Sequence, residues 1–104
     1  MTLYLSGPMT GMPFLNKPSF ERAAALLRAQ GHIVLNPHEI DQAAKLTWQV
    51  ALRIDLKVIL AHPDCGLVML PRWEISRGAC LERHVAEALG HPIFHLIDEE
   101  LVKQ

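Results

Sequence analysis

The chain has 104 residues, of which half are hydrophobic and 20% are charged, a composition typical of one globular domain spanning residues 1–104. The formal net charge of −1 gives no general attraction for nucleic acid or for an anionic membrane, so we expect neither partner. No apolar run is long enough for a membrane span and no signal-peptide pattern opens the chain, so we expect a cytoplasmic protein.

The residues that commonly bind metals are scattered in this sequence. Cys65 and Cys80 are the only cysteines, and we expect both to be reduced packing residues. The six histidines show no ligand spacing. The sequence therefore predicts neither a metal site nor a cofactor.

Strand and helix patterns alternate along the chain. The sequence predicts strands at residues 2–6, 32–35, 64–70 and 93–96 and helices at residues 18–29, 48–61 and 78–89. Pro18 suits the first turn of the first helix, Thr47 is an N-cap candidate for the second, and Gly31 and Gly90 are C-terminal caps. We expect a loop or weak helical turn at 38–46 and a short helix or frayed tail at 98–104.

This alternation predicts a three-layer α/β/α domain of the flavodoxin or Rossmann-like class. Its sheet would have four or five parallel strands in the order 2-1-3-4, joined by right-handed crossovers. Ligands of such sheets bind beyond the carboxyl ends of the strands, where the strand order reverses. Here the loops at 7–11 and 71–77 meet at that point.

The 78–89 helix carries a carboxylate on a face that should look inward. Its inward face is predicted to hold five residues, Ala79, Glu82, Val85, Ala86 and Leu89. A buried carboxylate costs several kcal/mol unless it is paired or hydrogen-bonded, and a catalytic site is one arrangement that compensates. The alternative is that Glu82 only complements the helix dipole.

Two segments near the predicted crevice could bind an anion. The first is a glycine-containing loop made of Ser6, Gly7, Pro8, Met9, Thr10 and Gly11. Its backbone N–H groups can approach a phosphate or a sugar, although its spacing fits neither the P-loop nor the dinucleotide fingerprint. The second is a helix N-terminus formed by Ser76, Arg77 and Gly78, which could instead be an ordinary cap.

Three further residues each have a functional and a structural interpretation. Trp73 could stack on a base at the mouth of the crevice, or cover an apolar patch. Asp55 lies on the 48–61 helix, next to a predicted buried stripe. It could be a functional carboxyl group near the crevice, or it could belong to a solvated face with its charged neighbours. Tyr4 would bury its ring in the first strand, where its hydroxyl needs a partner. The stripe predicted for that helix comprises Val50, Ala51, Ile54, Val58 and Ala61.

Taken together, these segments resemble the nucleoside 2-deoxyribosyltransferase-like superfamily, in particular a small branch of unassigned function from bacteria and phages. Strings of the type Tyr-Leu-Ser-Gly-Pro-Met-Thr-Gly, here residues 4–11, are typical of that branch. So is the type Trp-Glu-x-Ser-Arg-Gly-Ala-x-Leu-Glu, here residues 73–82. The resemblance covers residue 3 to about residue 97.

The resemblance implies cleavage of the N-glycosidic bond of a 2-deoxynucleoside or its 5-monophosphate, by hydrolysis or by deoxyribosyl transfer. It implies that Glu82 is the nucleophile, that Tyr4 orients it and that Asp55 helps to protonate the leaving base. It also implies that the glycine loop and Ser76 bind the phosphate, and that the protein is a homo-oligomer because family sites are often shared between subunits.

The sequence departs from the family pattern at Thr10, where relatives that hydrolyse nucleotides tend to carry an arginine; Arg77 or Lys17 could supply the cation instead. Two alternatives therefore stay open. One is a non-catalytic nucleotide-binding module or sensor with the same fold. The other is a structural or interaction protein whose Glu82 has no chemical role.

Overall fold

The computed structural model of the protein describes residues 1–40 and 47–104. The strands are β1 (Thr2–Ser6), β2 (Ile33–Leu35), β3 (Gly66–Met69), β4 (Ile93–Ile97) and β5 (Glu100–Lys103). The α-helices are α1 (Lys17–Ala29), α2 (Pro37–Ile40), α3 (Trp48–Ala61) and α4 (Arg77–Ala88), and short 3-10 helices lie at η1 (Pro13–Asn16) and η3 (Trp73–Ile75). The segment predicted as a loop or weak helical turn was residues 38–46. Helix α2 covers its first residues, and residues 41–46 lie outside the described residues.

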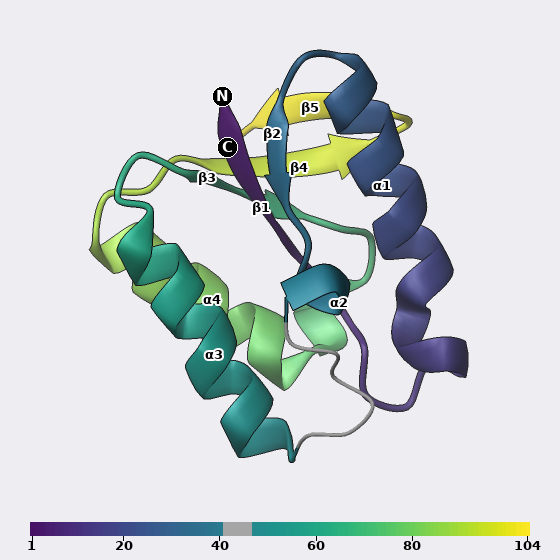
Figure 1. The fold of residues 1–104 in the computed structure, drawn as a ribbon, viewed down its shortest axis with the longest axis vertical. Helices are drawn as coiled ribbons and strands as arrows, with labels where there is room; N and C mark the ends of the chain where they lie inside the picture. Colours follow the sequence, from purple (N-terminus) through teal and green to yellow (C-terminus); the bar gives the residue numbers. More distant parts are fainter. Residues whose placement is uncertain (41–46) are drawn as a thin grey trace.

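The sheet has the order β2-β1-β3-β4-β5, and β1 to β4 are parallel. The predicted α/β class and the predicted order of the first four strands are therefore confirmed. Helices cover both faces of this sheet (Figure 1). Among the described residues, the helices are too short or too polar to cross a membrane.

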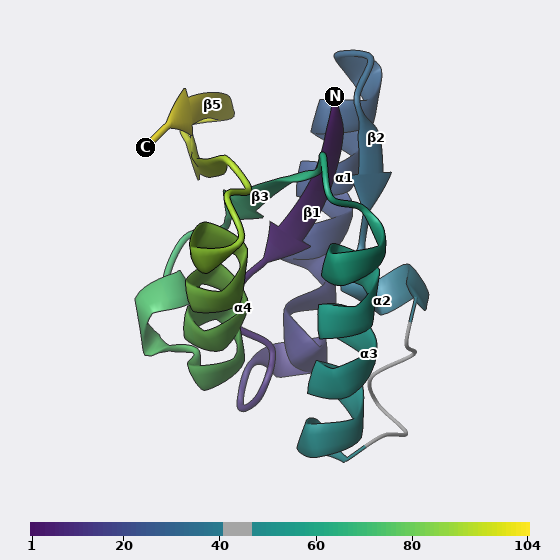
Figure 2. The same ribbon diagram turned by 90° about the vertical axis from the view of Figure 1, so that its left-hand side faces the viewer.

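Each face of the sheet has its own apolar core. Leu3 and Leu5 of β1 belong to the apolar cluster that includes residues of α1, whereas Tyr4 belongs to the cluster that includes residues of α3 and α4. These helices lie on different sides of β1 (Figure 2). This division follows from the strand itself, because successive side chains alternate between the two faces. Tyr4 and Ser6 therefore both face the layer that contains Glu82.

The carboxyl ends of β1 and β3 lie next to each other. Ser6 is in register with Met69, and the Leu70 N–H donates a hydrogen bond to the Ser6 carbonyl over 2.8 Å. The following residue, Gly7, packs so closely that a Cβ there would lie 2.9 Å from the Leu70 Cβ. The strand ends thus place the loops after β1 and β3 together, at the predicted reversal of strand order.

The predicted helix signals are present. The Thr47 hydroxyl accepts a hydrogen bond from the Val50 N–H and begins α3, and Ser76 caps α4 in the same way. Gly31 and Gly90 follow α1 and α4 with φ of 93° and 87°, a left-handed conformation that favours glycine. These local signals were sufficient to predict where the helices begin and end to within a few residues.

The carboxyl-terminal prediction was wrong. Residues 98–104 were expected to form a helix or a frayed tail, but β5 pairs antiparallel to β4 and makes the sheet mixed. Asp98 and Glu99 connect the strands with φ of 49° and 65°. A two-residue turn with two positive φ angles usually contains glycine or asparagine. An Asp-Glu turn therefore gives little sequence signal for a hairpin.

The predicted buried stripe of α3 was also wrong. The buried residues of this helix are Asp55 and Ile59, whereas Val50 and Ala61 are exposed. Apolar side chains occur on several sides of α3, so their spacing does not define one inward face. The observed rotation of the helix turns Asp55 toward the cavity that Glu82 of α4 also lines.

Candidate active site

Glu82 is the centre of the candidate site. It lies on the inward face of α4 and only 6% of it is exposed, as the helical spacing predicted. The Tyr4 hydroxyl donates a hydrogen bond to Glu82 Oε2 over 2.8 Å, and the Ser6 hydroxyl donates one to Oε1 over 2.7 Å. Each carboxylate oxygen therefore accepts a hydrogen bond from a different residue of β1.

This arrangement suits an ionised Glu82. An ionised carboxylate only accepts hydrogen bonds, and two hydroxyl donors can serve both of its oxygens at once. The donors come from Tyr4 and Ser6 because residues i and i+2 of a strand share a face. The interpretation of Glu82 as a helix-dipole residue alone does not account for these two contacts.

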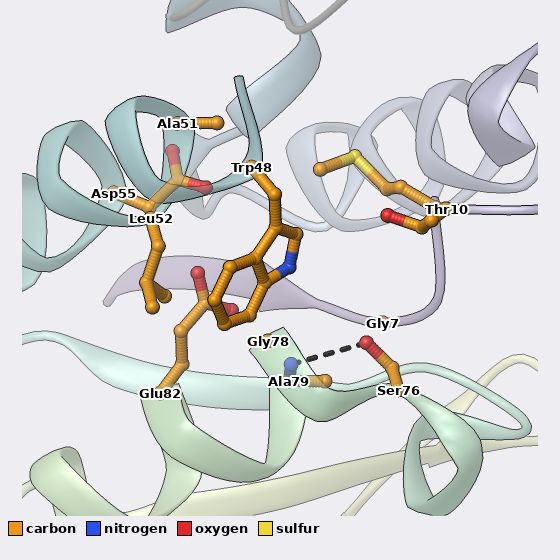
Figure 3. A pocket seen from close by; sticks show the side chains of 11 residues that line it. Gly7, Thr10, Trp48, Ala51, Leu52, Asp55, Ser76, Gly78, Ala79 and Glu82 are labelled. Carbon is orange, nitrogen blue, oxygen red and sulfur yellow. Dashed lines mark hydrogen bonds between the residues drawn. The ribbon is translucent and has the colours of Figure 1, made fainter. Parts of the chain in front are cut away.

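Asp55 approaches the same site from α3. Only 3% of Asp55 is exposed, and its carboxyl group and that of Glu82 line one cavity of about 50 Å³ between the two helices (Figure 3). The charged residues next to it in the sequence, Arg53 and Lys57, are exposed. Of the two interpretations of Asp55, the solvated charged face does not fit its burial, and two carboxyl groups meet at this cavity.

A wider hollow of about 360 Å³ adjoins the inner cavity, and Trp48 forms part of the wall of both. The Arg77 guanidinium lies over the Trp48 ring, 4.4 Å from its centroid. The Ser76 hydroxyl accepts a hydrogen bond from the Ala79 N–H over 3.1 Å, so Ser76 is an N-cap as well as a lining residue (Figure 3). The wider hollow is lined by Pro8, Thr10, Met12, Trp48, Ile75, Ser76, Arg77 and Gly78.

The residues of the predicted binding loop have different surroundings. Gly7, Met9 and Thr10 line the inner cavity, and Pro8 lines the wider hollow. Gly11 lines neither of these two cavities; it is exposed with φ of 80°, which suits a turn. Ser6 is buried beneath the loop and contacts Glu82, so its hydroxyl does not face the hollow.

Trp73 was predicted at the mouth of the crevice, and this prediction was wrong. It lies in η3 and lines a separate cavity of about 350 Å³ together with His95. The two rings are 5.9 Å apart between centroids, and the Arg83 guanidinium lies 5.0 Å from the Trp73 ring. The apolar-cover interpretation fits these contacts better.

Trp48 takes the place that was expected for Trp73, and sequence reasoning missed it. Its indole lines the inner cavity together with Asp55 and Glu82, and it also lines the wider hollow (Figure 3). The only local signal was its position directly after the Thr47 N-cap, which says where α3 begins but not which way its first side chain points. The packing of α3 on the sheet decides that direction.

Metal chemistry has no candidate among the described residues. No group of three or more His, Cys, Asp and Glu side chains within residues 1–40 and 47–104 is placed to hold an ion. The chemical groups of the site include two carboxyl groups, the hydroxyls of Tyr4 and Ser6 beside Glu82, and the helix N-terminus with Arg77 in the wider hollow.

The fold is that of a nucleoside 2-deoxyribosyltransferase-like protein. Among solved structures, the chain is similar to a 2-deoxyribosyltransferase from the psychrotolerant bacterium Bacillus psychrosaccharolyticus, with a TM-score of 0.66 and 21% sequence identity. The match covers 91% of this chain and 71% of that one, which is described as a biocatalyst for the synthesis of antiviral and antitumoral nucleosides. This similarity confirms the predicted relationship at the level of the fold.

The chain belongs to the family described as "Domain of unknown function (DUF4406)", whose model matches residues 1–95. No functionally curated protein matches the sequence. A shared fold alone does not establish a shared reaction.

Proposed function

We propose that the protein cleaves the N-glycosidic bond of a 2-deoxynucleoside or its 5-monophosphate, with Glu82 as the nucleophile. The observation that carries this proposal is the buried Glu82 carboxylate, which is held at both oxygens by hydroxyls and faces a cavity shared with Asp55. Paired carboxyl groups of this kind perform glycosidic cleavage in retaining glycosidases. The similarity to a deoxyribosyltransferase fold supports the same chemistry.

The reaction proceeds in two balanced steps. A Glu82 oxygen attacks the anomeric carbon, the carbon–nitrogen bond breaks and its electron pair moves to the base, which takes a proton from Asp55. Water or a second base then attacks the same carbon, and the ester bond to Glu82 breaks. Asp55 accepts the proton released by the attacking group. Each residue thus returns to its starting state.

The wider hollow would bind the parts of the substrate that do not react. Arg77 and the free N–H groups at the start of α4 suit the 5-phosphate, because a helix N-terminus attracts anions. Thr10 lies in the same hollow without a charge, and exposed Lys17 lines neither cavity, so among residues 1–40 and 47–104 Arg77 is the cation that this site offers. The Trp48 indole offers a flat surface on which a base can stack.

Substrate entry requires a movement of Trp48. The inner cavity of about 50 Å³ is far below the range of about 300–1,000 Å³ that is usual for small-molecule sites, whereas the wider hollow lies within it. Turning the Trp48 side chain would join the two spaces above Glu82. Because the chain has two tryptophans, a Trp73→Phe variant isolates Trp48 fluorescence, which should change when a deoxynucleoside binds.

The test is chromatographic detection of free base. The protein is incubated with each 2-deoxynucleoside and its 5-monophosphate, with and without a second free base. We expect base release or exchange that is lost in Glu82→Gln. Glu87→Gln is the matched control, because it makes the same change on the exposed side of the same helix and should retain activity. Release without an acceptor base indicates a hydrolase, and exchange alone indicates a transferase.

A folded protein that releases no base from any substrate would contradict the enzymatic proposal. The non-catalytic binding module would then be favoured if nucleotides still raised its melting temperature, because a ligand that binds only the folded state stabilises it. If the protein released no base and nucleotides did not raise its melting temperature, both the enzymatic proposal and the binding module would be wrong.

We also propose that the protein is a homo-oligomer. Large apolar side chains are exposed on the two helices that cover the same face of the sheet: Val50 and Leu60 on α3, and Leu81 and Leu89 at α4 and its carboxyl end. Burying such a surface against a second copy would remove it from water. Light scattering coupled to size-exclusion chromatography tests this, and a mass of 11.7 kDa at all concentrations would contradict it.

A further inference from the structure

We infer that Ser6 is a positioning residue for Glu82 and not a ligand of the substrate phosphate. This inference rests on the proposed function, because it assigns Ser6 to the nucleophile of that reaction. Sequence reasoning had placed Ser6 in the glycine-containing loop with the phosphate-binding residues. The structure separates it from the rest of that loop.

The burial of Ser6 distinguishes it from Thr10, and the direction of its hydroxyl distinguishes it from the loop residues that line the two cavities. It is the last residue of β1 and only 1% of it is exposed, whereas Thr10 of the same loop is exposed and lines the wider hollow. Its hydroxyl donates to Glu82 Oε1 over 2.7 Å, slightly shorter than the 2.8 Å hydrogen bond from the Tyr4 hydroxyl to Oε2. Ser6 is also not among the residues that line either described cavity.

The second donor changes what Tyr4 alone could achieve. One hydroxyl bound to one oxygen leaves the carboxylate free to rotate about its terminal carbon–carbon bond. Donors on both oxygens, Tyr4 at Oε2 and Ser6 at Oε1, fix the plane of the group and stabilise its charged form. A carboxylate oxygen has more than one lone pair, so accepting a hydrogen bond from Ser6 or Tyr4 does not by itself prevent its attack on the anomeric carbon. Ser6 thereby orients the nucleophile without touching the substrate.

The inference predicts the ionisation of Glu82 directly. Samples labelled with ¹³C at the glutamate side-chain carboxyl are titrated by NMR, and the Glu82 signal is assigned by its absence in Glu82→Gln. In Ser6→Ala the midpoint should rise by roughly one to two pH units, the effect of losing one hydrogen bond to a charged group. Ser6→Thr, which keeps the hydroxyl, should restore the lower midpoint.

Two controls separate the effect of Ser6 on the Glu82 midpoint from effects of neighbouring titratable groups and of changes to β1. In the part of the chain that the structure describes, residues 1–40 and 47–104, the titratable residues that face Glu82 are Tyr4 on β1 and Asp55 on α3. The titration is therefore repeated in Asp55→Asn to separate the coupling of the two carboxyl groups. Thr2→Ala removes a hydroxyl from the same face of β1, roughly 13 Å from Ser6, and should leave the midpoint unchanged. If Ser6→Ala does not fold, Ser6→Cys provides a near-isosteric side chain with a much weaker donor.

Kinetics provide the second readout. Ser6→Ala should lower kcat by roughly 10- to 100-fold with little change in KM, and the acidic limb of the kcat profile should move up with the NMR midpoint. A phosphate ligand would behave differently: its loss would raise KM for the monophosphate and leave kcat unchanged. That result would overturn the inference.

The two proposals can fail separately. An unchanged Glu82 midpoint in folded Ser6→Ala overturns the role of Ser6, whatever the activity of the protein. A raised midpoint supports that role even if the wild-type protein releases no base, in which case only the proposed reaction is wrong.

Discussion

Replacing Tyr4 by Phe removes one hydroxyl from the site and leaves the ring in place. Tyr4 is fully buried, and its hydroxyl donates to the Glu82 carboxylate over 2.8 Å. The substitution therefore keeps the apolar packing between β1 and the helices but takes one of two donors from a buried charge. We expect it to lower the stability of the protein and not to open a cavity.

The expected loss follows from the kind of hydrogen bond involved. A hydrogen bond to a charged group contributes about 1.5–3 kcal/mol, against about 0.5–1.5 kcal/mol for one between neutral groups. Ser6 still serves Oε1, so Glu82 is not left without a donor. We expect the free energy of unfolding of Tyr4→Phe to fall by about 1.5–3 kcal/mol at neutral pH.

Urea denaturation at neutral pH measures this loss, and a second background tests its cause. In Glu82→Gln the partner of Tyr4 is neutral, so Tyr4→Phe should there cost only about 0.5–1.5 kcal/mol. The difference between the two costs is the coupling energy of the pair. Equal costs in both backgrounds, or a loss below about 0.5 kcal/mol in the wild type, would refute the interpretation of Glu82 as a buried charge held by Tyr4.

Three further predictions concern the rest of the molecule. Gly66→Ala should cost about 1–3 kcal/mol in urea denaturation, because a Cβ there would lie 2.8 Å from the Phe94 ring; adding Phe94→Leu should recover part of the loss. The hydrogen bond from Arg28 lowers the pKa of Glu39 below its ordinary value of 4.5. The pair therefore stabilises the fold fully when the pH is above that ordinary pKa, and this stabilisation is lost as the pH falls through the lowered pKa. Glu39→Gln should therefore cost less than about 1 kcal/mol at neutral pH, since the pair is exposed, and a cost that persists in acid would contradict this. Burial raises the pKa of the Cys65 thiol above its ordinary value of 9.0, so stability should decline as the pH rises from 9.0 through the raised pKa, and Cys65→Ala should lack that decline.

Local patterns were sufficient to predict most of the fold. Strand–helix alternation, the caps at Thr47 and Ser76 and the glycines after α1 and α4 each act within a few residues, so their signal can be read directly from the sequence. The prediction failed at β5, where an Asp98-Glu99 turn replaces the usual glycine or asparagine.

The site could be predicted only where one element defines its direction. Glu82 shares a clear inward face with Ala79 and Ala86, so its helical spacing alone indicated burial. On α3 the apolar residues surround the helix, and the spacing did not show that Asp55 points inward. For the same reason the sequence did not show that Trp48 lines the site, and Trp73 was predicted there in its place.

The sequence by itself determined the class of fold, the order of the parallel strands and a carboxylate on the inward face of α4. The family resemblance implied that Tyr4 and Asp55 act together with Glu82. The tertiary structure alone decided that Ser6 donates to the second oxygen of Glu82 and that Trp48 lines the same cavity. The physical reason is the range of the forces. Periodicity and capping are properties of a few neighbouring residues, whereas the rotation of α3 and the registry of α4 against β1 result from many weak packing contacts between distant parts of the chain.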